Sequence, residues 1–295
     1  METVESLKRR IESTEDLQSV VKTMKALAAV KIRQFERAVE SLEDYYRTVE
    51  MGLRAVFQGG RTGQVFTRKG TGQMTGAVVF GSDQGMCGQL NDQVVGHTLN
   101  HLDDLQARPE KRILLPVGER VRARLEEQGQ PLEAAMAVPG GVSGIAPRVR
   151  DLLLKILSWQ EEQGVDRVLL FHSEPVSGAS YRPRTISLLP LDQVWLAGLR
   201  KSPWPTRALP FFRGDPQALF SGLVREYLFV ALFRGFAQSL ASENASRLAS
   251  MQGAEKNIEE RLTDLQNRFH QQRQMSITEE LLDIVAGFEA LNQGD

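Results

Sequence analysis

Three glycines, Gly81, Gly85 and Gly88, lie within the stretch "VVFGSDQGMCGQLND" and could form a phosphate-binding turn. An apolar, strand-like run precedes them and a helix-like pattern follows, which is the usual order around a nucleotide-binding turn. Their spacing differs from G-x-G-x-x-G, in which the second glycine lets the backbone approach the pyrophosphate, and no Gly-Lys-Ser/Thr follows. The spacing favours a strand that ends in a tight turn, where Ser82 and Asp83 hydrogen-bond nearby backbone amides.

The other residues that could do chemistry are few. His97 and His101 are four residues apart, a spacing that can chelate a metal on a helix, but no third ligand can be named and H-E-x-x-H is absent. Cys87 is the only cysteine, which excludes an intrachain disulfide and favours a small buried side chain in a reducing compartment. Because G-x-S-x-G and C-x-x-C are also absent, we expect no catalytic residue, no cofactor and no metal.

Charge and hydropathy exclude two further classes of protein. The 295 residues include 36 basic and 37 acidic side chains, so the net charge of -1 gives no overall attraction to nucleic acid or anionic lipid. The longest uncharged run, from Ala134 to Pro147, contains two prolines and three glycines and is shorter than the ~20 apolar residues of a spanning helix. We therefore expect a soluble protein without signal peptide or membrane span, which does not bind nucleic acid.

Both ends of the chain have the periodicity of long helices. Between Val4 and Val56 an apolar residue recurs at alternating intervals of three and four, at thirteen of sixteen positions, with Thr14, Gln18 and Lys25 as the exceptions. No proline precedes Pro109, so this pattern predicts one continuous helix of about 53 residues, or ~80 Å.

The C-terminal pattern runs from Phe220 to Ser276, where twelve of seventeen positions are apolar, and no proline follows Pro216. Near the tip the stripe shifts by one position and continues at Ile277, Leu281, Ile284, Phe288 and Leu291. This shift rotates the apolar face, so we expect the last turns to meet a different surface.

These elements together predict an α/β fold class. Residues 1–58 and 214–292 would form an antiparallel two-helix coiled coil, with parallel dimerisation as the alternative. Residues 73–200 would form an inserted, Rossmann-like α/β domain, because strand-like runs alternate with helical stretches at 89–105, 118–129 and 148–163. The strand-like runs, which should form a mainly parallel sheet, are "TGAVVFGS", "KRILLPVG", "DRVLLFHS" and "RTISLLPL". Residues 59–72 are glycine-rich and typical of a linker, and "PGGVSGIAP" is typical of a loop.

Three sequence motifs resemble the gamma subunit of F-type ATP synthases. "GSDQGMCGQLN" is similar to the family's S-D-x-G-L-C-G-x-L-N, with Met86 for the usual leucine and Gln89 for the usual glycine. "KTMKALAAVKIR" is similar to K-A-M-x-M-V-A-A-S-K-M-R, with Val30 where serine is common. "ASENASRLASMQGAEKN" and "RQMSITEELLDIVAG" resemble A-S-E-x-A-A-R-M-x-A-M-x-x-A-x-x-N and R-Q-A-x-I-T-Q-E-L-x-E-I-V-x-G. The likeness spans nearly the whole chain, with the motifs in the family's order.

The resemblance implies a rotor shaft that turns inside a ring of alternating alpha and beta subunits, with catalysis in beta. Its α/β domain would lie near the membrane rotor ring and the epsilon subunit, so the protein would be peripheral on the cytoplasmic face of the cell membrane. Met24 and Lys25 match a contact of the N-terminal helix with beta, and Arg247 and Thr278 match contact positions of the C-terminal helix. Glu279 stands where the family usually has glutamine. The amide of glutamine both donates and accepts hydrogen bonds, whereas an ionised carboxylate only accepts them.

Two other functions share some of these features. A static coiled-coil scaffold with an α/β domain would have the same long helices, and a nucleotide-binding enzyme would use the same α/β layer. The glycine spacing disfavours the enzyme. A stoichiometric complex with a hexameric ATPase would distinguish a rotor from a scaffold.

Overall fold

A computed structural model describes residues 3–58, 74–176, 180–201, 204 and 210–292. The chain divides into two compact units. The first comprises Met1–Leu27 and Ala249–Asp295, and the second comprises Ala28–Leu248. Two long helices, α1 (Val4–Ser41) and α7 (Pro216–Asn292), each contribute to both units.

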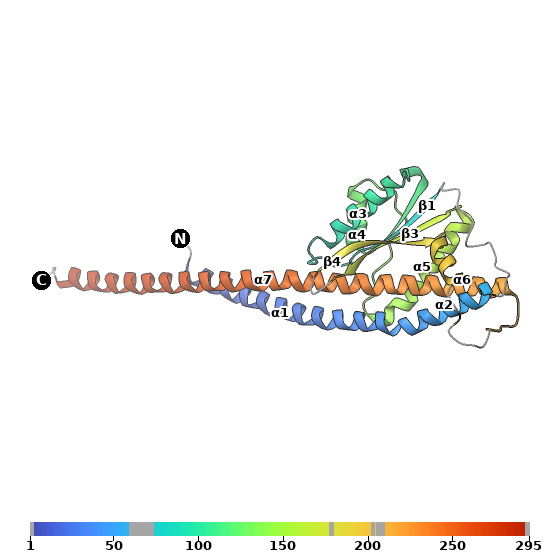
Figure 1. Cartoon of the computed structure of the whole chain (residues 1–295). Coiled ribbons are helices and arrows are strands. Elements are labelled where there is room, and N and C mark those ends of the chain that lie inside the picture. Colours follow the sequence, from blue (N-terminus) through green and yellow to red (C-terminus); the bar gives the residue numbers. More distant parts are fainter. Residues whose placement is uncertain (1–2, 59–73, 177–179, 202–203, 205–209, 293–295) are drawn as a thin grey trace. The chain divides into compact units, whose positions relative to one another are not determined.

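In the first unit, the start of α1 runs antiparallel to the end of α7 (Figure 1). Every position of the predicted apolar stripe from Val4 to Lys25, and from Met251 to Ser276, is buried or half-buried. Leu7 and Leu265, both 2% exposed, are among the best covered. The antiparallel two-helix fold predicted from the periodicity is thereby confirmed. From Ile277 to Gly287, by contrast, every described side chain is exposed.

The prediction of one unbroken N-terminal helix is wrong at Leu42. Helix α1 ends at Ser41 and α2 spans Glu43–Gln58. The Ser41 hydroxyl donates a hydrogen bond of 3.0 Å to the Ala38 carbonyl, which the Leu42 amide would use in a regular α-helix. The Leu42 amide instead donates to the Val39 carbonyl, one residue nearer. The Leu42 amide therefore changes its acceptor at the break between the two helices, although the apolar stripe continues.

The second unit contains a four-stranded sheet in the order β2-β1-β3-β4. Its strands are β1 (Thr75–Phe80), β2 (Arg112–Val117), β3 (Arg167–Pro175) and β4 (Tyr181–Leu189). Strand β1 pairs in parallel with β2 and with β3, as the alternating pattern predicted. Strand β4 is antiparallel to β3, because the short connection between them leaves no room for the crossover that a parallel strand needs.

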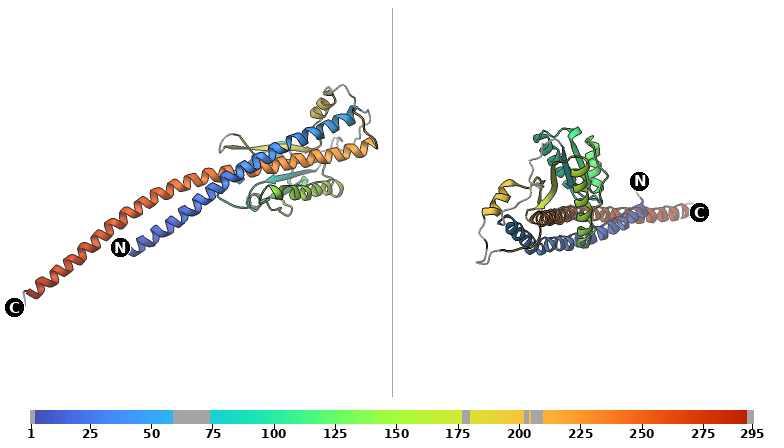
Figure 2. Two further views of the ribbon diagram at one scale, coloured as in Figure 1. Left: turned by 90° about the horizontal axis from the view of Figure 1, so that it is seen from below. Right: turned by 90° about the vertical axis from the view of Figure 1, so that its right-hand side faces the viewer.

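Helices cover both faces of this sheet. Helices α3 (Leu90–Asp104) and α4 (Glu119–Glu127) pack on one face, in a core that includes Ala77 and Val79 of β1. Helices α5 (Val142–Glu162) and α7 pack on the other, in a core that includes Val78 and Phe80. Figure 2 shows the same arrangement from two further directions. The remaining elements are a 3₁₀ turn at Pro109–Lys111 and helix α6 at Gln193–Lys201.

Helix α5 begins earlier than the sequence predicted. The stretch "PGGVSGIAP" should be a loop by its prolines and glycines, but the helix starts at Val142 and includes Pro147. Ile145 and Val149 are fully buried in the core, which offsets the one intrahelical hydrogen bond that proline cannot donate. In the part of the chain that the structure describes, we find no helix with the length and apolar character of a membrane span.

Candidate functional site

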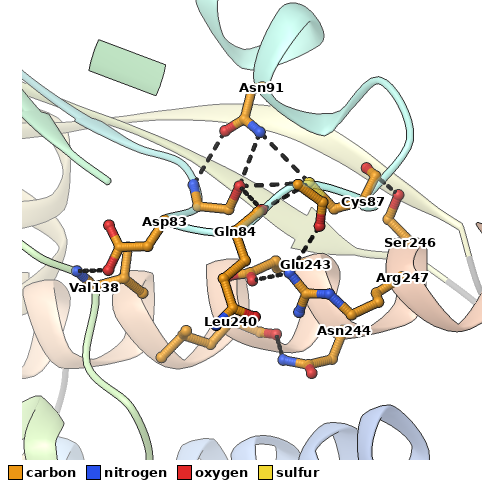
Figure 3. A network of polar contacts seen from close by, with 12 residues as sticks. Asp83, Gln84, Cys87, Asn91, Val138, Leu240, Glu243, Asn244, Ser246 and Arg247 are labelled. Carbon is orange, nitrogen blue, oxygen red and sulfur yellow. Dashed lines mark hydrogen bonds and ion pairs between the residues drawn. The ribbon is translucent and has the colours of Figure 1, made fainter. Parts of the chain in front are cut away.

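The glycine turn between β1 and α3 is held by its own side chains (Figure 3). The Ser82 amide donates to Asn91 Oδ1 at 3.1 Å, and Asn91 Nδ2 donates to Ser82 Oγ at 2.9 Å. Asp83 accepts two backbone amides, from Glu119 to Oδ1 and from Val138 to Oδ2, each at 3.0 Å. Asp83 thus hydrogen-bonds backbone amides as predicted, and it ties the turn to α4 and to the segment before α5.

The first glycine of the turn, Gly81, is closely packed. A Cβ atom at Gly81 would lie 2.5 Å from both Asn91 Oδ1 and Val121 Cβ, so side chains already occupy that position. The Gly81 amide donates to the Val117 carbonyl and the Ser82 amide to Asn91, so neither is available to a ligand. Cys87, 2% exposed, is buried beside the turn, as expected. Gly81 therefore serves close packing, and the first two amides of the turn are not arranged to bind a phosphate.

Helix α7 presents a cluster of buried polar side chains to this turn. Ser242 Oγ donates to the Ser173 carbonyl at 3.1 Å, and Ser246 Oγ donates to the Cys87 carbonyl at 2.6 Å. Arg247 Nη2 donates to Glu243 Oε1 at 2.7 Å and to the Gly85 carbonyl at 3.4 Å. We call Ser242, Glu243, Ser246 and Arg247 the polar clamp; all four are less than a tenth exposed. Figure 3 shows three of its members, Glu243, Ser246 and Arg247, beside the turn.

The clamp contains a buried ion pair beside a small cavity. Burial raises the pKa of Glu243, while Arg247 and, more weakly, Lys31 act in the opposite direction. A cavity of about 110 Å³ adjoins the pair. Its lining includes Lys31, Asp83, Gln84, Glu243, Asn244 and Arg247. Two cationic and two anionic side chains line it, so the cavity has no strong preference for an anion or a cation.

The five predicted contact residues do not form one site. Met24 and Lys25 are half-buried on α1, and Lys25 pairs with Glu255 of α7. Thr278 and Glu279 are exposed near the end of α7, where the Thr278 hydroxyl donates to the Gln274 carbonyl of its own helix. Arg247 belongs to the second unit, and its guanidinium hydrogen-bonds within the chain.

Two exposed apolar surfaces accompany these residues. The tip surface comprises Met275, Ile277, Leu281, Leu282, Ile284 and Val285, each between 47% and 69% exposed. The outer stripe of α1 comprises Leu17, Val20, Leu27 and Val30, each 54–56% exposed, and Met24 falls within its spacing. This second stripe was not predicted from the sequence, although its intervals of three and seven residues are those of one face of a helix.

The histidines contribute to packing. His97 Nε2 lies 2.8 Å from Thr185 Oγ1, and the His97 and His101 rings are 6.2 Å apart. Burial, followed by the neighbouring His101, lowers the pKa of His97. Among the described residues, no group of three or more His, Cys, Asp or Glu side chains is arranged to hold a metal ion.

Comparison with known proteins identifies related sequences over the whole chain. A family model described as ATP synthase matches residues 3–291. The ATP synthase gamma chain of Cyanothece sp. (strain PCC 7425 / ATCC 29141) is 27% identical, covering 99% of this chain and 100% of the relative. That of Heliobacterium modesticaldum is also 27% identical, covering 97% of this chain and 98% of the relative.

Solved structures share the fold. A chain of the Euglena gracilis mitochondrial ATP synthase, from a structure of OSCP, F1 and the c-ring, superimposes with a TM-score of 0.67 at 16% identity. The match covers 99% of this chain and 95% of that one. A chain of the Tetrahymena thermophila mitochondrial ATP synthase central stalk and c-ring gives a TM-score of 0.57 at 22% identity, covering 80% and 99%.

Proposed function

Because the chain belongs to the ATP synthase family and its curated relatives are gamma chains, we propose that it is the central rotor shaft of an F-type ATP synthase. The observation that carries this proposal is the match of the family model to residues 3–291, which includes both long helices and the α/β domain between them. The same observation favours a rotor over a static scaffold or a nucleotide-binding enzyme, since relatives cover the complete architecture.

The parts of the chain have different roles in this proposal. Residues 1–58 and 214–292 form the shaft, and residues 73–200 form the domain that lies near the membrane rotor ring and the epsilon subunit. The protein is then peripheral to the membrane, on its cytoplasmic face. The ring around the shaft consists of alpha and beta subunits.

We propose that the shaft contacts the surrounding ring through its exposed apolar surfaces. The tip surface lies where the helix pair no longer covers its own side chains, so an apolar sleeve of the ring is its proposed environment. The outer stripe of α1, with Met24, faces beta in the same proposal. Residues 17–33 contain four basic side chains, Lys22, Lys25, Lys31 and Arg33, and no acidic one. An acidic surface on beta therefore complements this stretch.

Catalysis follows from differential binding. Three beta subunits with the same sequence surround a shaft whose faces differ, so each subunit contacts different shaft residues at any moment. A conformation of beta that binds a given face more tightly becomes more populated there, and the site affinity for nucleotide changes with it. When ion flow turns the shaft, the nucleotide affinity of each beta subunit then changes in sequence. Met24, Lys25, Thr278 and Glu279 are the proposed contacts that carry these differences.

Crosslinking the shaft to the ring tests the proposal. Cys87→Ser first removes the only thiol. Leu27→Cys then places a thiol on α1 at a position that is 54% exposed and one turn from Met24. Paired with an engineered cysteine on beta, it should form a disulfide if the two α-carbons approach within ~7 Å. Oxidation of the assembled complex should abolish multi-turnover ATP hydrolysis, and a reductant should restore it.

The matched control is the Cys87→Ser complex that carries only the beta cysteine, which should keep its hydrolysis under oxidant. Undiminished hydrolysis in a complex with complete crosslinking on a gel would show that this part of the chain does not rotate. Failure of the chain to co-purify with a hexameric ATPase would exclude the subunit assignment altogether.

A further inference from the structure

We infer that Arg247 is a positioning residue that locks the glycine turn of the α/β domain onto α7 and so transmits torque between them. The locking is a property of the chain alone. Its consequence for torque rests on the proposed function.

The apolar attachment of α7 to the α/β domain ends before Arg247. The α7 residues in the large shared core extend from Phe220 to Ala241. Beyond Ala241, the described α7 side chains that hydrogen-bond to the α/β domain belong to the polar clamp, and the second unit ends at Leu248. The clamp therefore makes the last attachment of α7 within this unit.

The clamp binds the turn on both sides of its strained residue. Met86 has φ of 60°, a left-handed conformation that is unfavourable for a residue with a side chain. Arg247 binds the carbonyl of Gly85, which precedes Met86, and Ser246 binds the carbonyl of Cys87, which follows it. Two adjacent residues of α7 thus hold the segment that would otherwise relax.

Glu243 orients the guanidinium of Arg247. The two side chains are each 9% exposed and lie four residues apart on one helix. Since a buried charge without a counterion is strongly unfavourable, the pair keeps Arg247 at the turn and away from solvent. One Arg247 nitrogen, Nη2, contacts both Glu243 and the Gly85 carbonyl, so loss of Arg247 removes both interactions at once.

Hydrogen exchange of the full-length chain tests the clamp. In Arg247→Met, we expect the backbone amides between Gln84 and Asn91 to exchange about ten- to a hundredfold faster, as expected for loss of hydrogen bonds from a charged donor. The amides of β1 should keep their protection. Arg268→Met is the matched control, because Arg268 pairs with Asp264 four residues away on the same helix but is 52% exposed.

Faster exchange in Arg247→Met could also result from the unpaired charge of Glu243 or from a folding defect, and two further variants test these explanations. Glu243→Gln combined with Arg247→Met removes both charges of the pair. If Arg247 only neutralises Glu243, the double variant should regain the protection of the turn; if Arg247 positions the turn, exchange should stay fast. Ser246→Ala removes only the hydroxyl that binds the Cys87 carbonyl, and should accelerate exchange near Gly88 about tenfold with little risk to folding.

The torque role is tested in the assembled ATPase. With the catalytic ring fixed and a probe attached to the α/β domain, Arg247→Met should increase the variance of the angular fluctuations at least about twofold, and Arg268→Met should not. Unchanged exchange between Gln84 and Asn91 would overturn the clamp. Faster exchange with unchanged angular variance would overturn the torque role. Faster exchange in a chain that joins no rotary ATPase would support the clamp and contradict the proposed function.

Discussion

His172 shows how burial sets the charge of a single side chain. It is fully buried on β3, and among the described residues neither ring nitrogen has a hydrogen-bond partner. Its face of the sheet meets Gly235 of α7, where a Cβ atom would lie 3.2 Å from His172 Cδ2. Burial lowers the pKa of His172 to about 4. Glu174 opposes this effect, and Arg184 and His97 add to it, each more weakly than burial.

This pKa predicts a loss of stability in mild acid. Below the unfolded pKa of about 6.5 the unfolded chain binds a proton at His172 that the folded chain does not bind until pH falls to about 4. The free energy of unfolding should therefore fall as pH drops from 6.5 to 4, by up to about 1.4 kcal/mol per pH unit from this residue. Urea titrations of the wild type and of His172→Met at pH 7 and 5 measure the difference.

His172→Met should lose less stability between these two pH values than the wild type. His270→Gln, an exposed histidine on α7, is the control and should follow the wild type. An identical pH dependence in all three proteins would contradict a neutral buried His172.

Asp83 provides a prediction about the glycine turn. Its two carboxylate oxygens accept the amides of Glu119 and Val138, so Asp83→Ala leaves two amides without their acceptor. We expect a loss of up to roughly 3–6 kcal/mol in the free energy of unfolding, because each of the two hydrogen bonds to the charged group contributes about 1.5–3 kcal/mol. Asp83→Asn keeps one acceptor and should lose about half as much. Equal stability of all three proteins in urea titrations would contradict this role.

At the scale of elements, sequence periodicity predicted burial well. All the positions of the two apolar stripes that the structure describes from Val4 to Val56 and from Phe220 to Ser276 are buried or half-buried. The break at Leu42 was missed because it is a change in one backbone hydrogen bond, which apolar periodicity does not register. The start of α5 was missed because burial of Ile145 outweighs the local preference of proline and glycine.

The polar clamp also could not be predicted from the sequence. The hydroxyls of Ser242 and Ser246 and the guanidinium of Arg247 bind backbone carbonyls, which every residue carries, so no complementary side chain marks the acceptor. The contact of Arg247 with another subunit stays a prediction, and the structure adds an intramolecular role to it.

Removal of the tip is the prediction for α7. Every described side chain from Ile277 to Gly287 is exposed, so deletion of residues 281–295 should change the melting temperature of the isolated chain by no more than about 2 °C. Leu265→Ala, at a seam position that is 2% exposed, should instead cost about 2–5 kcal/mol. In the assembled complex the deletion should weaken coupling between hydrolysis and ion transport. Loss of folding on deletion would contradict the exposed tip.

At the scale of the whole molecule, the described residues contain binding surfaces and no catalytic constellation. Exposed apolar side chains gather at the end of α7 and on α1, while Asn91 and Val121 occupy the space beside Gly81.

The isolated chain should therefore bind no nucleotide tightly. Isothermal titration of the purified full-length chain with ATP and Mg²⁺ should show no binding with micromolar affinity, because the Gly81 and Ser82 amides already have acceptors. The assembled catalytic ring, titrated in the same buffer, is the positive control. Saturable micromolar binding by the isolated chain, abolished by Gly81→Ala, would contradict this prediction.

Ser246 and Arg247 bind the turn through backbone carbonyls, and this affects which residues of the turn can be substituted. Carbonyl oxygens are insensitive to side-chain identity, so the turn can accept substitutions at Gln84 while α7 still binds it. Ser246 and Arg247 have no such freedom, because they supply the donors. In a library that randomises both segments, selection for growth on ATP synthesis should leave position 84 diverse, restrict position 86 to residues that adopt a φ of 60°, and keep positions 246 and 247 nearly fixed. At position 84 of the turn the sequence could then change freely, while the two donors of the helix could not.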